Sequence, residues 1–196
     1  PKTVKIATDG IALIINKQNP DSLIRVSDIR KILTGEVTDW NQIYQKSNLG
    51  KIQLVFDNAN SSTVRFAIDS ICQGKPLSPD LRAQKSNSGV IDYVAQDRNA
   101  IGVIGASWIG NKSDTTNLSF SDKITVMNVT ADDVATLANS YKPYQAYLAM
   151  GTYPLTRDVY IIITDPRSGL PTGFTTFVSS DKGQRIILKA GMVPAT

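Results

Sequence analysis

The chain has 196 residues, of which 41% are hydrophobic, and it carries 21 Lys and Arg against 17 Asp and Glu, for a net charge of +4. This length suffices for one sizeable core or two small lobes, and apolar runs such as 159–163 are far shorter than the roughly 20 residues of a membrane helix. The small positive charge is spread along the chain without a basic run, which argues against nucleic-acid binding.

Two residue types that build many active sites are scarce in this sequence. It contains no histidine and a single cysteine, Cys72. It therefore lacks the commonest general base and metal ligand, and it cannot form a cysteine-rich zinc site or an internal disulfide. We expect no catalytic residue, no metal and no cofactor. Cys72 shares a predicted helix face with Val64, Ile68 and Ile71, so we expect a small buried side chain rather than a reactive thiol.

Strand and helix signals alternate along the chain. In the first part of the chain, the pattern predicts strands at 4–7 and 11–15 around a bend at Thr8-Asp9-Gly10, and then a helix capped by Ser27 and stopped by Gly35. In the middle part it predicts a strand at 52–56, a helix from about Ser61 to Gln73, a helix through 90–94 and a buried strand after Asn99. In the last part it predicts a strand at 123–129, a helix capped by Thr130, a buried strand at 157–166 and a terminal helix within 172–194. This alternation predicts an α/β fold built from βα units.

The last strand and helix bear on the domain organisation. They are too small to own a core, so we expect them to pack on the N-terminal strands. This predicts a partial lobe made of residues 1–16 and 154–196 and an α/β lobe made of residues 17–153. Two crossing strands would join the lobes and form a hinge through Thr8-Asp9-Gly10 and residues 153–157.

A polar tetrapeptide, Asn60-Ser61-Ser62-Thr63, stands between a predicted strand and a predicted helix. The unpaired N–H groups of a helix N-terminus, together with Ser and Thr hydroxyls, can surround a tetrahedral oxyanion. A simple helix cap at Asn60 or Ser61 explains the same residues, and on composition alone the cap is favoured. Both interpretations stay open.

Charged and polar residues near this tetrapeptide add further candidates. Arg65 could contribute charge to a bound anion, or it could pair with Asp69 one helical turn later. Asp57 would repel an anion unless the anion carries a proton to donate, which favours hydrogen phosphate over sulfate, and it could equally cap a turn. A second polar cluster, which contains Ser88, opens the next helix and could face the first across a cleft, although capping explains it equally well.

Five stretches, taken in order, span nearly the whole chain: "TDGIALIINKQNP", "VSDIRKILTGEVTDWNQI", "NANSSTVRF", "SGVIDYVAQDRNAIGVIG" and "SSDKGQRIILKAGMVP". In this order they resemble the periplasmic phosphate-binding proteins of ABC transporters, in the type II solute-binding superfamily. The first is similar to that family's crossing strand, the second to its helix followed by a Gly and a Trp, and the third to its Ser-Gly-Thr phosphate loop. The fourth is similar to the next helix and strand, and the last to the C-terminal helix.

The resemblance implies a fold and a function. The fold would be α/β and type II periplasmic-binding-protein-like, with one complete α/β lobe plus a partial second lobe joined by two crossing strands. The protein would be an extracytoplasmic solute-binding protein, not an enzyme, that captures phosphate or a related oxyanion and hands it to an ABC-transporter permease in the membrane. A periplasmic or extracytoplasmic location follows, and a lipid anchor on the full-length protein is left open.

Carried over by position, the resemblance gives a set of ligand-binding candidates: Asp9, Asp57, Asn60, Ser61, Ser62, Thr63, Arg65 and Ser88. Within this set, Ser61, Ser62 and Thr63 would be the anion-loop residues. The chain departs from the family here, because Ser62 replaces a Gly and Asp57 stands where the family has an Arg. The Arg that often follows the Thr is displaced to Arg65. Loss of a guanidinium weakens the argument that phosphate itself is the ligand.

The family also begins with roughly one further half-lobe, which supplies another hydroxyl-rich loop and an acidic residue that accepts the phosphate proton. We expect this chain to lack that half-lobe and to expose apolar surface where it would pack. Self-association through the exposed partial lobe is then open.

Two rival functions remain. An interaction or sensory module that keeps the fold but has lost the ligand would fit the changes at Asp57 and Ser62. An enzyme with a loop serine as nucleophile fits less well, because the chain has neither a histidine nor a convincing Ser-Lys pair.

Overall fold

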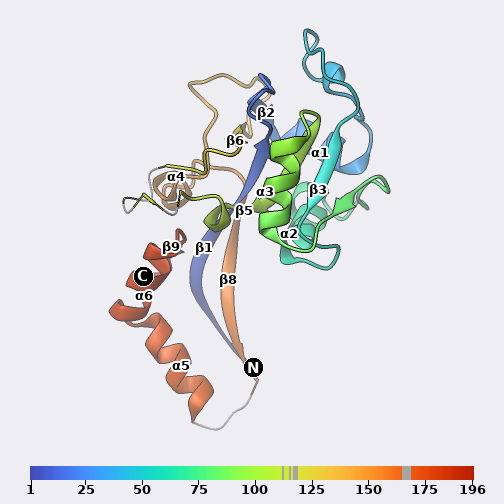
Figure 1. Ribbon diagram of the computed structural model, residues 1–196. Helices are drawn as coiled ribbons and strands as arrows, with labels where there is room; N and C mark the ends of the chain where they lie inside the picture. Colours follow the sequence, from blue (N-terminus) through green and yellow to red (C-terminus); the bar gives the residue numbers. More distant parts are fainter. Residues whose placement is uncertain (112, 115, 117–118, 165–168) are drawn as a thin grey trace.

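The structure is a computed structural model that describes residues 1–111, 113–114, 116, 119–164 and 169–196. Its helices and strands are β1 (Lys2–Ile15), β2 (Leu23–Arg25), α1 (Val26–Thr34), β3 (Gln53–Phe56), α2 (Ser62–Phe66), β4 (Arg82–Ala83), α3 (Asn87–Gln96), β5 (Ala100–Gly105), β6 (Thr125–Val126), β7 (Asn128–Thr130), α4 (Gln145–Ala149), β8 (Thr156–Ile163), α5 (Leu170–Ser179), α6 (Asp181–Lys189) and β9 (Val193–Pro194). Figure 1 shows a globular body from which β1 and β8 run out as a long pair, with α5 and α6 beside them.

One seven-stranded sheet organises these elements. Its order is β4-β3-β5-β1-β6, and β8 and β9 pair with β1 outside this path. β3 is parallel to β4 and to β5, whereas β1 is antiparallel to β5, with Ile11 opposite Gly105 and Ile15 opposite Ile101. The separate pairing of β2 with β7 in a small parallel sheet was not predicted. A mixed sheet with helices on both faces is an α/β architecture, as the sequence predicts.

The second half of β1 lies at the centre of the core. Ile11, Leu13 and Ile15 belong to the apolar cluster that contains residues of α1 and α2. Ala12 and Ile14 belong to a second cluster, with residues of α3. Because successive side chains of a strand point to opposite faces, both faces of the sheet are covered here. A strand buried on both faces is expected to be apolar at every position, which explains this part of the sequence.

The bend predicted at Thr8-Asp9-Gly10 is wrong. β1 continues through these residues as one strand, and it pairs with β8 from Lys2 to Gly10 before it pairs with β5. Gly10 lies in close packing and not at a turn, because a Cβ at this position would lie 2.9 Å from Leu148 Cδ2 and 3.3 Å from Ala106 Cβ. β1 is therefore a single strand with one half against β8 and the other half against β5.

The helix predicted after Thr130 is also wrong. Thr130 ends β7, and its hydroxyl accepts a hydrogen bond from the Asp132 N–H at 3.1 Å, but a loop follows. Val134 and Leu137 are 67% and 80% exposed, so a helix here would have no apolar face to bury. Asn139 stabilises the loop instead, donating to the Asp132 carboxylate and to the Val134 carbonyl.

Several helix ends differ from the prediction. α1 begins at Val26 with Arg25 rather than Ser27 in the cap position, and the Arg25 side chain pairs with Asp28 at 2.7 Å. Gly35 ends α1 with a φ of 80°, as predicted. The predicted terminal helix is interrupted at Ser180, which separates α5 from α6.

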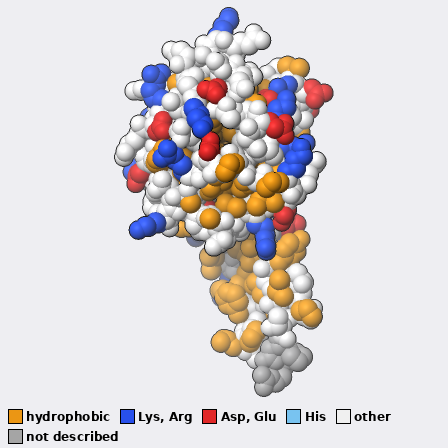
Figure 2. All heavy atoms as spheres, turned by 90° about the vertical axis from the view of Figure 1, so that its right-hand side faces the viewer, with side chains coloured by type: hydrophobic (Ala, Val, Ile, Leu, Met, Phe, Trp, Pro, Cys, Tyr) orange, Lys and Arg blue, Asp and Glu red, His pale blue; other side chains and the backbone are white. Residues whose placement is uncertain are grey.

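Much of the apolar surface on the outlying part of the molecule is exposed. We call β8, α5 and α6, with residues 2–5 of β1, the extension. β8 was predicted to be buried, yet Tyr160 and Ile162 are 50% and 64% exposed, and Phe174 on α5 is 57% exposed. Figure 2 shows hydrophobic side chains along the narrow part of the molecule below the globular body. In the part of the chain that the structure describes, no helix has the length and apolarity needed to cross a membrane.

Candidate functional site

The carboxyl ends of three parallel strands meet at one edge of the sheet. β3, β4 and β5 are neighbours with the same direction. α2 follows β3 and α3 follows β4, so both helices begin at this edge. In open α/β sheets, ligands bind outside the carboxyl ends of the strands. The tetrapeptide Asn60-Ser61-Ser62-Thr63 and the cluster that contains Ser88 therefore lie on the side of the sheet where a ligand is expected.

The structure identifies Ser61 as the helix cap. Its Oγ accepts a hydrogen bond from the Val64 N–H at 3.1 Å. Asn60 is not the cap, because Ser61 occupies the cap position; the Asn60 N–H instead donates to Asn58 Oδ1 at 2.9 Å in the preceding turn. A serine hydroxyl that accepts one bond keeps its proton to donate. Ser61 can therefore cap α2 and donate to a ligand at the same time.

The next two residues offer further hydroxyl donors. Ser62 is exposed, and its Oγ accepts a hydrogen bond from Arg157 Nη1 at 2.9 Å. Thr63 is only 3% exposed, and its hydroxyl has no hydrogen-bond partner among the described residues. The helix continues from Phe66 directly into a π-helical turn, Ala67–Ile71. The hydroxyls of Ser62 and Thr63 lie in the first turn of α2.

Arg157 on β8 is a candidate site residue that sequence reasoning missed. Its two terminal nitrogens contact different elements: Nη1 donates to Ser62, and Nη2 donates to Asp9 Oδ2 at 2.9 Å. The Asp9 side chain is 4% exposed and that of Arg157 is 21% exposed. Asp9 lies directly opposite Arg157 in the pairing of β1 with β8. The available signal was a charged residue in each predicted crossing strand, one acidic and one basic.

Gly105, at the end of β5, leaves room for this ion pair. A Cβ at Gly105 would lie 3.3 Å from Arg157 Nη2 and 3.3 Å from Asp9 Oδ2. Few real Cβ atoms make contacts this short, so a larger residue would displace one of the two side chains. The end of β5 thus helps to define the position of the guanidinium.

The other loop candidates fall into two groups. Asn60, Ser61, Ser62 and Arg65 line one open hollow of about 670 Å³ alongside α2. Arg65 is exposed, and among the described residues it forms no ion pair with Asp69, so the helical pair considered from the sequence is not formed.

Asp57 and Ser88 are not among the residues that line this hollow. Asp57 Oδ1 is buried without a hydrogen-bond partner among the described residues. Ser88 Oγ lies 3.0 Å from Ser86 Oγ, and Ser86 caps α3 by accepting a hydrogen bond from the Gly89 N–H at 3.1 Å. The second polar cluster therefore contains the cap of α3, and capping was one of the two roles that the sequence left open for it.

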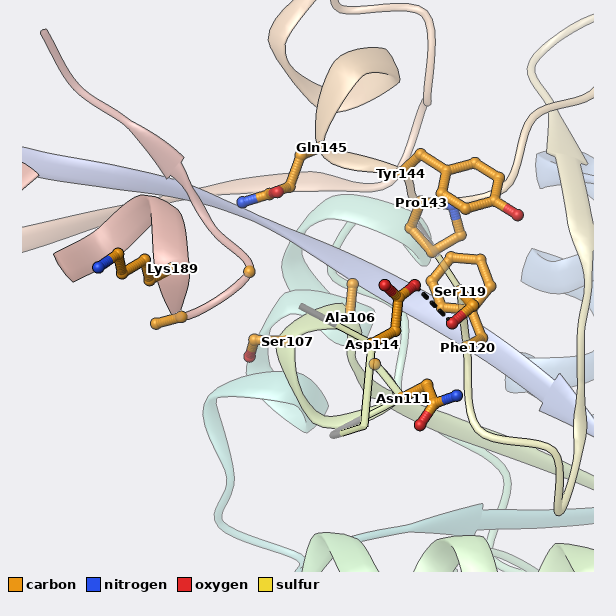
Figure 3. A pocket seen from close by; sticks show the side chains of 13 residues that line it. Ala106, Ser107, Asn111, Asp114, Ser119, Phe120, Pro143, Tyr144, Gln145 and Lys189 are labelled. Carbon is orange, nitrogen blue, oxygen red and sulfur yellow. Dashed lines mark hydrogen bonds between the residues drawn. The ribbon is translucent and has the colours of Figure 1, made fainter. Parts of the chain in front are cut away.

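A different hollow, of about 280 Å³, lies where the segment after β5 approaches the end of α6 (Figure 3). Its acidic residue is Asp114, whose pKa is held well below its usual value by hydrogen bonds from Thr116 and Ser119. Lys189 and Gln145 lie across the hollow from Asp114. Because Thr116 and Ser119 already donate hydrogen bonds to the Asp114 carboxylate, this hollow is a poorer candidate for binding an anion than the start of α2.

Metal and thiol chemistry find little support in the described residues. Within ranges 1–111, 113–114, 116, 119–164 and 169–196, no three His, Cys, Asp or Glu side chains gather as metal ligands would. Cys72 is fully buried, and burial raises the pKa of its thiol, so the prediction of a small buried side chain is confirmed.

Known proteins with similar sequences were found. The chain is 25% identical over 209 residues to the phosphate-binding protein PstS of Pseudomonas aeruginosa. This alignment covers 99% of this chain and 60% of the relative. It is 23% identical over 197 residues to the PstS of Bacillus subtilis, covering 98% of this chain and 57% of the relative. This chain therefore spans less than two thirds of the length of these relatives.

Solved structures give the same fold. The crystal structure of an ABC-type phosphate transport receptor from Vibrio cholerae matches with a TM-score of 0.76 and 22% identity, over 98% of this chain and 72% of that chain. The type II periplasmic binding fold implied by the sequence resemblance is thereby confirmed. A family model described as the PBP superfamily domain matches residues 1–182, and the chain belongs to this superfamily.

Proposed function

We propose that this chain is the anion-binding part of an extracytoplasmic solute-binding protein, which captures phosphate or a related oxyanion for an ABC transporter. The observation that carries the proposal is the hydrogen bond from Arg157 to Ser62 at the start of α2, where the sequence neighbours Ser61 and Thr63 supply two further hydroxyls. The names of the PstS relatives support phosphate as the anion. A membrane permease would be the partner that receives it.

Binding would depend on many donors of modest strength. The loop contributes neutral hydroxyls and backbone N–H groups, and Arg157 contributes the charge. A hydrogen bond to a charged acceptor stabilises a complex by about 1.5 to 3 kcal/mol. Three or four such bonds would contribute roughly 5 to 12 kcal/mol in total, from which the entropic cost of binding is subtracted. The proposed role needs no general base and no nucleophile, so we propose that the protein is not an enzyme.

We also propose a lobe organisation. Residues 1–16 and 154–196 would form the partial lobe and residues 17–153 the complete one, with closure as a hinge motion of β1 and β8. The exposed apolar residues of the extension, such as Ile162 and Phe174, would be covered by protein that corresponds to the part of the relatives which this chain does not span.

Calorimetric titration tests the binding function. Phosphate, with sulfate as control, is titrated into the chain after bound anion has been removed by unfolding, dialysis and refolding. Saturable heat with phosphate supports the proposal, and no heat with either anion contradicts it for this chain.

A variant of Thr63 tests the site. Thr63→Val keeps the shape of the side chain but removes its hydroxyl, so we expect at least a tenfold loss of affinity. Ser70→Ala, at the exposed far end of the same helical segment, should bind phosphate as the parent does. Equal affinities for both variants would place the anion elsewhere.

One observation favours the interaction-module alternative. Among the described residues, Asp57 Oδ1 is buried without a hydrogen-bond partner, at a position where the resemblance to phosphate-binding proteins implies an arginine. Failure of this chain to bind either phosphate or sulfate would favour this alternative.

A further inference from the structure

We propose that Arg157, on the crossing strand β8, is a direct ligand of the bound oxyanion and that Asp9 positions it. This inference rests on the proposed function, and it assigns a charge-bearing residue to the same site. The conclusion follows from three properties of Arg157: its free donors, its fixed orientation and its replaceable partner.

Arg157 has donors to spare. A guanidinium carries five N–H groups, and Arg157 uses one toward Ser62 and one toward Asp9. Its remaining N–H groups have no partner among the described residues. With 21% of its side chain exposed, Arg157 can be reached by a small solute. The flat guanidinium is suited to donating two parallel bonds to an oxyanion.

Asp9 fixes the orientation of the guanidinium. Both of its carboxylate oxygens are engaged, Oδ2 by Arg157 Nη2 and Oδ1 by the Gly10 N–H at 2.9 Å. Asp9 is nearly inaccessible to solvent and belongs to a continuous strand, so it cannot follow a moving side chain. This changes the role suggested for Asp9 by the sequence, from ligand to positioning residue.

Ser62 is the partner that an anion can replace. Its hydroxyl is neutral and exposed, and an anion accepts a hydrogen bond from a guanidinium more strongly than a hydroxyl does. When an oxyanion arrives, Nη1 of Arg157 can donate to it, and the Ser62 hydroxyl can turn to donate to the same anion. Arg65, by comparison, is exposed on the last turn of α2, without an ion pair among the described residues to hold it in place.

Phosphate affinity, measured by calorimetry on the full chain, tests the role of Arg157. We expect Arg157→Gln to lower the affinity at least tenfold, and Arg157→Lys to fall between that variant and the parent, because it keeps the charge but not the paired donors. Arg98→Gln is the matched control: Arg98 is exposed and precedes β5, at the opposite edge of the sheet, so its loss should change affinity less than twofold. Circular dichroism of each variant verifies that it folds.

A double variant tests the positioning role of Asp9. If Asp9 acts through Arg157, Asp9→Asn lowers phosphate affinity in the parent but has no further effect in the Arg157→Gln background. A residue needed only for the stability of the strands would lower affinity equally in both backgrounds.

The outcomes separate the inference from the function. If the parent binds phosphate and Arg157→Gln binds it within twofold of the parent, the inference is overturned while the proposed function stands. If the parent binds no phosphate, both are overturned.

Discussion

The two halves of β1 have different surroundings, although both contain aliphatic residues typical of a core strand. Residues 11–15 are completely buried, with β5 alongside and apolar clusters on both faces of the sheet. Residues 2–5 are exposed or half-buried, and so are most of the β8 residues opposite them. The same contrast holds between the globular body and the extension as a whole.

The difference shows that an apolar strand is buried only where other layers cover it. The segment Val159–Ile163 is as apolar as the second half of β1, but it has no second layer over much of its surface. Large exposed apolar patches mark interaction surfaces in soluble proteins. Four pairs of variants, one member in each region, can sharpen or break this comparison.

The largest difference is expected for aliphatic truncations. Leu13→Ala removes a fully buried side chain and should lower the free energy of unfolding by about 2 to 5 kcal/mol. Ile162→Ala removes one that is 64% exposed and should change it by no more than about 0.5 kcal/mol. Urea unfolding followed by circular dichroism measures both. Similar losses for the two variants would mean that β8 is covered in solution.

The second largest difference is expected between two ion pairs that join β1 to β8. Arg157 and Asp9 form the sheltered pair, whereas Lys5 and Asp158, 2.7 Å apart, form a pair whose side chains are 41% and 38% exposed. Asp9→Asn leaves Arg157 partly buried without its partner and should cost about 2 kcal/mol, below the usual figure for a fully buried pair. Lys5→Gln should cost under about 1 kcal/mol.

Salt provides the control for these two variants. Added sodium chloride should reduce the small effect of Lys5→Gln and leave that of Asp9→Asn nearly unchanged. An equal salt response would show that the Arg157–Asp9 pair is open to solvent.

Two tyrosines should contribute differently to the loss of stability at alkaline pH. Burial raises the pKa of Tyr153, whose hydroxyl donates to the Ile11 carbonyl at 2.7 Å. Because the pKa is higher in the folded state, the unfolded chain loses this proton first, so the stabilisation is complete below about pH 10 and is lost as the pH rises above it. The expected loss is about 1.4 kcal/mol per pH unit.

Unfolding measured between pH 9 and 12 tests this expectation. In Tyr153→Phe, the free energy of unfolding should fall less steeply with rising pH, because unfolding no longer releases the proton of this tyrosine. Tyr160, on the extension, is the comparison: its hydrogen bond to Asp158 raises its pKa, but the group is exposed, so Tyr160→Phe should alter the slope much less. Identical slopes for the parent and Tyr153→Phe would contradict the assignment.

The smallest difference is expected between two helix caps. Ser61 Oγ accepts from the Val64 N–H at 3.1 Å, and Ser180 Oγ accepts from the Gly183 N–H at 3.4 Å. Ser61→Ala should cost about 1 kcal/mol. Ser180→Ala should cost about as much, because it loses a longer capping bond together with the hydrogen bond that Ser180 Oγ donates to the Phe177 carbonyl at 2.6 Å. Thermal unfolding detects both changes, and a clearly larger loss at one of the two caps would contradict this expectation.

Local sequence patterns predicted those elements whose cause is local. β3, β5 and α3 lie close to the predicted strands and helix because their apolar spacing and caps stand within a few residues of them. The buried state of Cys72 followed from its helix face in the same way. Other features depend on residues that are distant in sequence, such as Leu148, which explains Gly10 without a bend.

The candidate site divides along the same line. Ser61 was predicted as a cap or ligand from its position before a helix, and the structure identifies the cap. Arg157 was missed because its partners Ser62 and Asp9 are 95 and 148 residues away in the sequence. The pairing of β8 with β1 places Arg157 opposite Asp9, and Ser62 meets Arg157 from the start of α2. The assignment of these residues to an anion stays a prediction.

The positions of the two tryptophans give the protein its own optical probes. Trp40 is completely buried, and its indole N–H donates to the Asn99 carbonyl at 2.9 Å. Trp108 is 59% exposed and borders Gly105, beside Arg157 and Asp9. Emission from Trp40 should stay at short wavelength and resist quenching by iodide until the core unfolds, whereas emission from Trp108 should be quenched readily and respond to events at the ion pair. Fluorescence can thus distinguish binding from unfolding without an added label.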